Sequence, residues 1–184
     1  KKQRVIIFAD GMPTMPSKKS VLEFFSKKGF WVFAPRYRGT WESDGKFLKQ
    51  SPHQDVLDVI EQLPKGFTSL WDGTHHRLSP HQLIIIGSSF GGPAGLMLSC
   101  DPRVSKVVAV SSVIDWQKPG PEEPMGFLKK FIDQAFGAAY RIDPAGWHKL
   151  TAGKLYNPIK HIKDIDGGKI LLIHAKDDLS LIHI

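Results

Sequence analysis

A serine lies between glycines at the end of an apolar run, in the stretch Gly87-Ser88-Ser89-Phe90-Gly91. The stretch matches the pattern G-x-S-x-G, directly after an apolar segment and before a run of small residues that begins at Gly92. A serine at a sharp strand-to-helix turn exposes its hydroxyl, and the turn needs small neighbours because the strand and the helix approach closely. The pattern therefore predicts that Ser89 is a nucleophile for acyl transfer.

The same stretch has two other interpretations. One is a Gly/Ser-rich turn without chemistry. The other is a loop that binds a nucleotide phosphate, but neither G-x-G-x-x-G nor G-x-x-x-x-G-K-[ST] is present. The helix expected after Ser89 directs its N-terminal amides toward the hydroxyl. We therefore expect the Phe90 N–H to stabilise an oxyanion.

Short apolar runs alternate with helical patterns along the chain. Runs of this length, rich in Val, Ile, Leu and Phe, are typical of strands that are covered on both faces. Five such runs are Val5–Ala9, Phe30–Ala34, Leu83–Ile86, Lys106–Val110 and Lys169–His174. Strand, helix, strand order predicts a parallel sheet with right-handed crossovers.

Two helices are expected before the serine. The stripe Val21, Leu22, Phe24 and Phe25 predicts a helix over Lys18–Lys28 with Gly29 as its stop. Ser51-Pro52-His53-Gln54 reads as a capping box that opens a second helix, and Pro64 ends it. The inward side chains of that second helix are expected to be Val56, Leu57, Ile60 and Leu63.

Two segments interrupt the alternation. Residues 66–81 read as a polar loop that carries Trp71, and residues 113–168 insert Pro-rich and helical material before the last strand. Within the insertion, an apolar face at helical spacing predicts a helix packed on the core, with a cap over a substrate pocket and a membrane-surface helix as alternatives. That face consists of Phe127, Leu128, Phe131, Ile132, Ala135 and Phe136. Aromatic residues of the insertion and Trp71 are candidates for substrate selection, and Tyr37 and Trp41 are further candidates near the same sheet edge.

Composition excludes several classes of protein. The chain has 184 residues, of which 41% are hydrophobic and 23% charged, which excludes disorder and coiled coil. Its net charge of +7 comes from scattered pairs such as Lys18-Lys19, which we interpret as solvated, so a nucleic-acid partner is not expected. The single cysteine, Cys100, excludes an internal disulfide and is compatible with a reducing, cytoplasmic location. No apolar run is long enough to span a bilayer.

Several segments together resemble the α/β-hydrolase superfamily, in particular the small serine hydrolases near its prolyl-oligopeptidase and dienelactone-hydrolase-like branch. Phe8-Ala9-Asp10-Gly11-Met12-Pro13 is similar to the family's His-Gly-x-Pro turn, and Tyr37-Arg38-Gly39 with Ser43-Asp44-Gly45 is similar to its R-G-x-G-x-S loop. Leu171–Asp178 is similar to the L-x-I-H-G-x-x-D segment that carries the triad acid. The resemblance covers most of the chain. It implies an α/β-hydrolase fold: a mostly parallel five-strand sheet with helices on both faces, a small helical cap insertion, and missing edge strands.

The resemblance also implies roles for individual residues. The Met12 N–H is the second oxyanion donor, and Asp178 is the triad acid. Two departures stand out: Asp10 replaces the family's His, and a carboxylate there disfavours an oxyanion unless its side chain turns away. The family's catalytic His follows the acid by tens of residues, whereas only six residues follow Asp178 here. The seven histidines before Asp178 remain candidates for the base, but most of them have a better structural interpretation than a triad role.

The end of the chain has an unusual sequence. Leu179–Ile184 (LSLIHI) resembles the in-frame translation of a transposon-end sequencing adapter, so we expect a single domain over residues 1–178 followed by a non-native tail. A genuine apolar strand or helix is the alternative. For this reason His183 is not assigned as the base, and the fragment is expected to be inactive.

These observations lead to one functional prediction. We expect a serine hydrolase that cleaves a small ester or peptide-like substrate through an acyl-enzyme on Ser89, with no cofactor and no metal. A non-catalytic binding module of the same fold is the alternative, because of Asp10 and the missing base.

Overall fold

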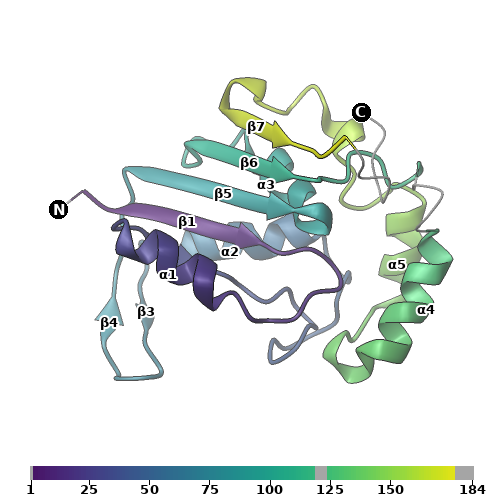
Figure 1. The fold of residues 1–184 in the computed structure, drawn as a ribbon, viewed down its shortest axis with the longest axis horizontal. Coiled ribbons are helices and arrows are strands. Elements are labelled where there is room, and N and C mark those ends of the chain that lie inside the picture. The colour runs from purple at the N-terminus through teal and green to yellow at the C-terminus, as the bar shows by residue number, and fades with distance from the viewer. Residues whose placement is uncertain (1, 119–123, 177–184) are drawn as a thin grey trace.

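The protein has one parallel sheet with helices on both faces (Figure 1). The structure, a computed structural model, describes residues 2–118 and 124–176. The sheet has five strands in the order β2-β1-β5-β6-β7, and every neighbouring pair is parallel. Its strands are β1 (Arg4–Ala9), β2 (Trp31–Phe33), β5 (Gln82–Ser88), β6 (Lys106–Val110) and β7 (Ile170–Ile173). The five apolar runs of the sequence are therefore the five strands of this sheet, as predicted.

β1 and β5 pair over more residues than any other two neighbouring strands of this sheet. β1 pairs with β5 from Arg4 and Gln82 to Ala9 and Gly87, so the two strands end at the same edge of the sheet. Every second side chain of β5 is buried from Leu83 onward, in the alternation expected of a pleated strand. The turn that carries Ser89 and the turn that follows Ala9 therefore lie side by side.

Helices cover the two faces unequally. α1 (Lys19–Lys27) lies on one face, and α2 (Pro52–Gln62) and α3 (Gly92–Leu98) lie together on the other (Figure 1). α2 buries Val56 and Ile60, as predicted, and Leu63 just beyond its end is also buried. α1 buries no residue fully, and Phe24 remains 54% exposed, so its apolar stripe covers the sheet less completely than expected.

The predicted capping box at Ser51 is wrong. Ser51 does precede α2, and Pro52 is its first residue, but the Ser51 side chain caps no backbone amide. Its hydroxyl instead bonds the Nδ1 of His53 at 2.8 Å. The imidazole of His53 has thus taken the place of the helix amide that the spacing suggested as the partner of Ser51.

Residues 66–81 are more ordered than a polar loop. They form a hairpin of β3 (Phe67–Thr68) and β4 (His75–His76), whose tip carries the fully exposed Leu70 and Trp71. The hairpin leads directly into the start of β5, so it lies at the amino ends of the strands, opposite to Ser89 (Figure 1). The expectation that Trp71 helps to select a substrate is therefore wrong.

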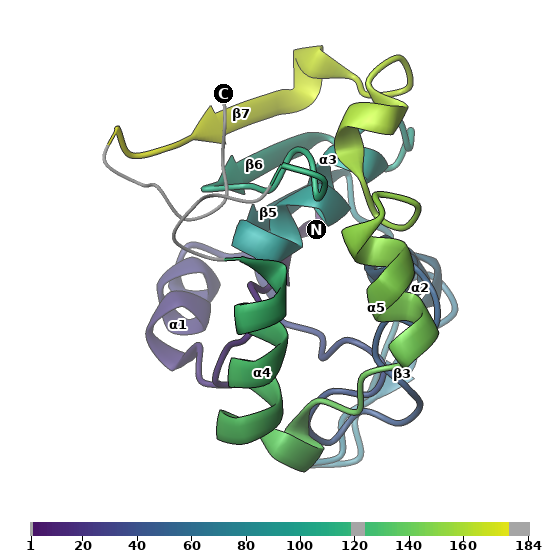
Figure 2. The ribbon, with the colours of Figure 1, turned by 90° about the vertical axis from the view of Figure 1, so that its right-hand side faces the viewer.

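The insertion contributes two helices beyond the carboxyl ends of the strands. α4 (Met125–Ala135) and α5 (Pro144–Thr151) stand in front of this edge of the sheet (Figure 2). α4 buries Met125, Leu128 and Ile132 in the core, but Phe127 is 62% exposed and Phe131 44%. Half of the predicted apolar face thus packs on the protein and half faces solvent.

Candidate active site

Ser89 has the backbone conformation of a strained turn. β5 ends at Ser88, a single 3-10 turn η1 (Ser89–Gly91) follows, and α3 begins at Gly92. Ser89 has a φ of +49°, a region that non-glycine residues rarely adopt and that is common at functional sites. Its side chain is half-buried, and the whole turn lies at the carboxyl edge of the sheet.

The glycines around Ser89 are required by close packing. A Cβ on Gly91 would overlap the carbonyl oxygen of Ala9, and a Cβ on Gly92 would overlap the side chain of Ser112. The small residues of the motif thus allow the turn to pack against the ends of β1 and β6. This is the reason for the spacing that the sequence displays.

Phe90 fixes the turn from the buried side. Its ring is 1% exposed and is surrounded by four aromatic rings at centroid distances of 5.2 to 5.6 Å. These rings belong to Tyr37, Phe47, Trp116 and Tyr156. Because the side chain of Phe90 is held on several sides, its backbone amide is held as well.

The loop after β1 lies beside Ser89. A Cβ on Gly11 would be 3.5 Å from the Cβ of Ser89, and Met12 is buried with only 6% of its surface exposed. The predicted oxyanion loop and the predicted nucleophile therefore come from neighbouring strands and meet at one edge of the sheet. This proximity is required if the Met12 and Phe90 amides are to serve the same oxyanion.

Side chains from distant segments hold this loop. The Tyr37 hydroxyl donates to the Asp10 carbonyl at 3.1 Å, and the Trp41 indole donates to the Thr14 carbonyl at 3.1 Å. The Thr14 N–H donates to the Tyr140 hydroxyl at 3.0 Å. Tyr37 and Trp41 were candidates for this sheet edge, whereas Tyr140 comes from the insertion and was not singled out.

The two tyrosines are protonated at neutral pH. Burial, with Tyr156 and Asp10 adding to it, raises the pKa of Tyr37 well above its usual value. Burial also raises the pKa of Tyr140. Both hydroxyls therefore keep their protons over the physiological range, and the hydrogen bonds that hold the loop do not change there.

The carboxylate of Asp10 has a cationic partner. The Lys18 ammonium lies 3.1 Å from the Asp10 carboxylate, and these two side chains are 28% and 10% exposed. The sequence left open whether this carboxylate turns away from the oxyanion site. The interpretation of Lys18-Lys19 as a solvated pair is wrong for Lys18 and correct for Lys19, whose side chain is 86% exposed.

The second motif of the resemblance is held by α2. The Arg38 guanidinium donates to Asp55 and, at 2.5 Å, to Asp58. Burial raises the pKa of the Asp55 carboxyl, although its hydrogen bonds with Arg38 oppose this effect. Gly39 follows with a φ of +75°, and its N–H donates to the Asp44 carbonyl at 2.8 Å. These contacts fix the loop that carries Tyr37.

Four histidines of the described residues have a hydrogen-bond or ion-pair partner away from Ser89. His53 bonds Ser51, His75 bonds Thr68, His81 bonds the carbonyl of Gln3, and His161 pairs with Asp164. None of these partners is Ser89. Asp178, the predicted triad acid, and His183 lie outside the described residues.

Within residues 2–118 and 124–176, no three metal-ligating side chains come together as a metal site. In the same part of the chain, no helix is both long and apolar enough to cross a membrane. An open hollow of about 670 Å³ lies between α1 and β2, and another of about 470 Å³ lies between α3 and β7; Ser89 lines neither of them.

Sequence reasoning missed Lys18 and Tyr140 as residues of this site. Lys18 is one of a pair of lysines with no motif, and Tyr140 follows an apolar helix in an insertion. Their contacts with the loop after β1 depend on how distant segments pack, and no local pattern signals such contacts.

No protein-family model matches the sequence, and no curated protein matches it either. Solved structures do share the fold. An esterase from Pyrococcus furiosus matches 98% of this chain with a TM-score of 0.61 at 18% identity. A monoglyceride lipase from Saccharomyces cerevisiae matches 99% of it with a TM-score of 0.59 at 14% identity. A bottromycin epimerase matches 96% of it with a TM-score of 0.54 at 16% identity.

These similarities identify the architecture as the α/β-hydrolase fold, as the sequence predicted. The chain spans 64% of the length of the esterase, which is less than two thirds, 71% of the lipase and 74% of the epimerase. One fold thus serves hydrolases and an epimerase, so the chemistry of this protein has to be argued from its own residues.

Proposed function

We propose that this chain carries the nucleophile and the oxyanion site of a serine hydrolase, which cleaves an ester or peptide-like bond of a small substrate through an acyl-enzyme on Ser89. The observation that carries the proposal is the half-buried serine with a φ of +49° at the junction of β5 and α3. Its position directly beside the Gly11–Met12 loop supports the same assignment.

The proposed reaction has two steps. The Ser89 oxygen attacks the substrate carbonyl while a base takes its proton, and the oxyanion accepts hydrogen bonds from the Met12 and Phe90 amides. The carbon–heteroatom bond breaks, and the leaving alcohol or amine receives that proton. Water then attacks the acyl-enzyme in the same way and releases the acid. Asp178 is the proposed triad acid that orients the base.

Covalent labelling of the full-length protein tests the proposal. A fluorophosphonate probe phosphonylates a serine only when a base activates it, so we expect labelling that peptide mapping assigns to Ser89. Ser89→Ala should abolish labelling. Ser88→Ala is the matched control, because Ser88 is the exposed neighbour at the end of β5, and this variant should be labelled like the wild type.

A non-catalytic module of the same fold is the second candidate, and Asp10 in the predicted oxyanion loop is the observation that favours it. The ion pair with Lys18 weakens this argument because it offsets the negative charge. Absence of labelling in a folded protein would favour the second candidate instead.

A further inference from the structure

The backbone of Asp10 is fixed against the turn that carries Ser89. A Cβ on Gly91 would lie 2.6 Å from the Asp10 carbonyl oxygen, so this carbonyl packs directly on η1. The Tyr37 hydroxyl holds the same carbonyl at 3.1 Å. Asp10 also immediately precedes Gly11 and Met12, so its side chain starts within the loop that supplies one proposed oxyanion donor.

A carboxylate in this place opposes the proposed chemistry. The Asp10 side chain is 10% exposed, so water screens its charge only weakly. Negative charge develops on the substrate oxygen in the transition state, and a nearby unpaired carboxylate would raise the energy of that state. The site therefore needs a compensating positive charge.

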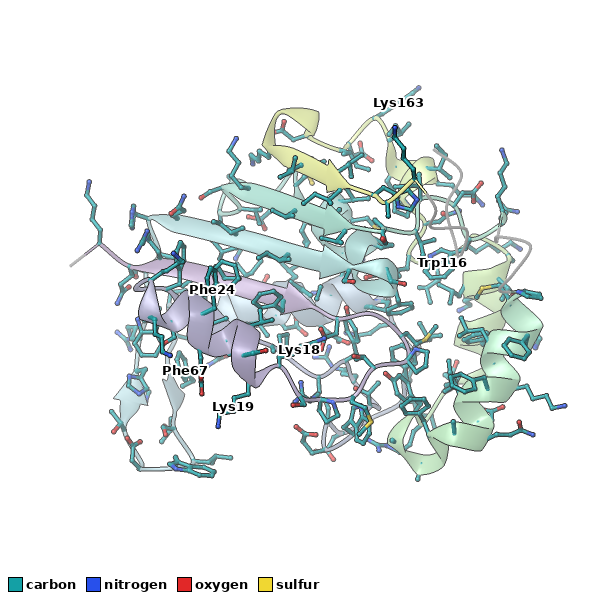
Figure 3. All side chains as sticks on the ribbon, in the orientation of Figure 1. Lys18, Lys19, Phe24, Phe67, Trp116 and Lys163 are labelled. Atoms are coloured by element: carbon teal, nitrogen blue, oxygen red, sulfur yellow. The ribbon has the colours of Figure 1, made fainter. Side chains whose placement is uncertain are left out.

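Lys18 supplies that charge from the residue before α1. Its ammonium is 3.1 Å from the carboxylate, and its side chain is 28% exposed. The adjacent Lys19 differs sharply, because its side chain is 86% exposed and lies 3.9 Å from Glu23 on the same helix. Figure 3 labels both lysines at the amino end of α1. Two consecutive lysines thus have different environments, and Lys18 is the one that pairs with the carboxylate of the loop beside Ser89.

We propose that Lys18 is a positioning residue of the proposed hydrolase: its ammonium neutralises Asp10 and so keeps the oxyanion site free of net negative charge. This inference rests on the proposed function. The pair Asp10–Lys18 acts on the transition state more than on substrate binding, because the substrate carbonyl is uncharged before attack.

A double-mutant cycle on the full-length protein tests the inference. The variants are Lys18→Met, Asp10→Asn, their combination, and Lys19→Met as the matched control. For each variant, kcat and KM are measured with p-nitrophenyl acetate, and the fluorophosphonate labelling rate is measured in parallel. Thermal unfolding of each variant shows whether it is folded.

The expected kcat values distinguish an effect of charge from a loss of structure. Lys18→Met should lower kcat, by about tenfold or more, with KM nearly unchanged, because the uncompensated Asp10 charge would repel the negative charge that develops on the oxyanion. Adding Asp10→Asn should restore kcat to within about threefold of the wild type, since it removes the uncompensated charge. Lys19→Met should behave like the wild type.

Other outcomes reject the inference. A Lys18→Met enzyme with unchanged kcat, or a double variant as slow as the single one, would show that neutralisation has no role. If Lys18→Met does not fold, Asp10→Asn decides: a kcat above that of the wild type supports the inference, because the uncompensated Lys18 charge would stabilise the oxyanion, and an equal or lower value overturns it. A wild-type protein with neither turnover nor labelling would instead reject the proposed function itself, and the inference with it.

Discussion

Ser89 combines backbone strain with tight packing. A non-glycine residue at a φ of +49° costs on the order of 1 kcal/mol, and the surrounding contacts must offset that cost. The buried ring of Phe90 and the close approach of Gly91 to β1 provide those contacts. The same contacts that hold this strained turn therefore make it sensitive to small added volume.

Gly91→Ala should destabilise the protein by about 2 kcal/mol or more, because the new methyl group would overlap the Ala9 carbonyl and neither backbone can move freely. Denaturant unfolding measures the change. Gly126→Ala in α4 is the matched control, since its Cβ would meet nothing within 4 Å, and it should leave stability unchanged or slightly higher. Equal stability of the two variants would contradict the packing argument.

Asp101 should contribute to stability in a pH-dependent way. Hydrogen bonds from Arg103, at 2.6 to 2.9 Å, lower the pKa of the Asp101 carboxyl. A lowered pKa in the folded state means that the contribution is present above the unfolded value of about 3.9 and is lost as the pH falls through the folded value. Asp101→Asn should therefore lose less Tm than the wild type between about pH 5 and pH 2.5. Parallel acid profiles of Tm for the two proteins would show that this carboxyl has no such role.

At the level of elements, hydrogen bonds connect the insertion to the loops that follow β1 and β2. The insertion pairs with the loop after β2 through backbone hydrogen bonds, such as those from Trp41 to Ala139 at 2.7 Å and from Arg141 to Gly39 at 2.8 Å. Tyr140, between these two partners, accepts the Thr14 N–H. Tyr140 thus connects the segment between α4 and α5 with the loop that carries the proposed Met12 donor.

Tyr140→Phe tests this connection with little change in volume. Loss of the hydroxyl leaves the Thr14 N–H without its acceptor, which costs about 1 to 3 kcal/mol for a buried amide and less here because Thr14 is partly exposed. We expect faster hydrogen exchange at residues 11–15, with the amides of β6 as the internal control, and slower fluorophosphonate labelling. Unchanged exchange at residues 11–15 would show that the hydroxyl does not hold the loop.

For the molecule as a whole, one end of the sheet within the described residues is an exposed apolar strand. β7 lies at the end of the strand order, and Leu171, Leu172 and Ile173 are each about half exposed, at 46 to 55%. The hollow of about 470 Å³ below this strand is lined by Ile162, Ile170 and other apolar residues. An exposed apolar edge strand favours association with other chains.

The 184-residue polypeptide should therefore self-associate as its concentration rises and should bind an apolar dye such as ANS. Leu171→Lys should reduce both effects, because a charge on an edge strand opposes further strand pairing. Leu70→Lys is the control, since Leu70 is fully exposed but lies in the hairpin tip. Sedimentation velocity measures the association, and an equal effect of the two substitutions would remove the edge strand as its cause.

Local patterns were sufficient for most of the architecture. The five apolar runs became the five strands, and the helix predicted over residues 18–28 formed as α1 (Lys19–Lys27), shortly before Gly29, whose φ of +81° suits a helix stop. Burial repeats every second residue in a strand and every three to four residues in a helix, so neighbouring residues already contain this information. The glycine spacing around Ser89 is local in the same sense, because it reflects the geometry of a single turn.

Local patterns did not predict the contacts between segments that are distant in the sequence. Tyr140 meets Thr14 across 126 residues, and Lys18 turns toward Asp10 while the adjacent Lys19 turns to solvent, although the two lysines are identical in type. Half of the apolar face of α4 stays exposed for the same reason: the face follows from helical spacing, but its cover depends on which surfaces come within reach. Such contacts are decided only when the sheet, α1 and the insertion pack together, because the energy of an ion pair or a buried ring depends on the three-dimensional surroundings and not on the order of residues along the chain.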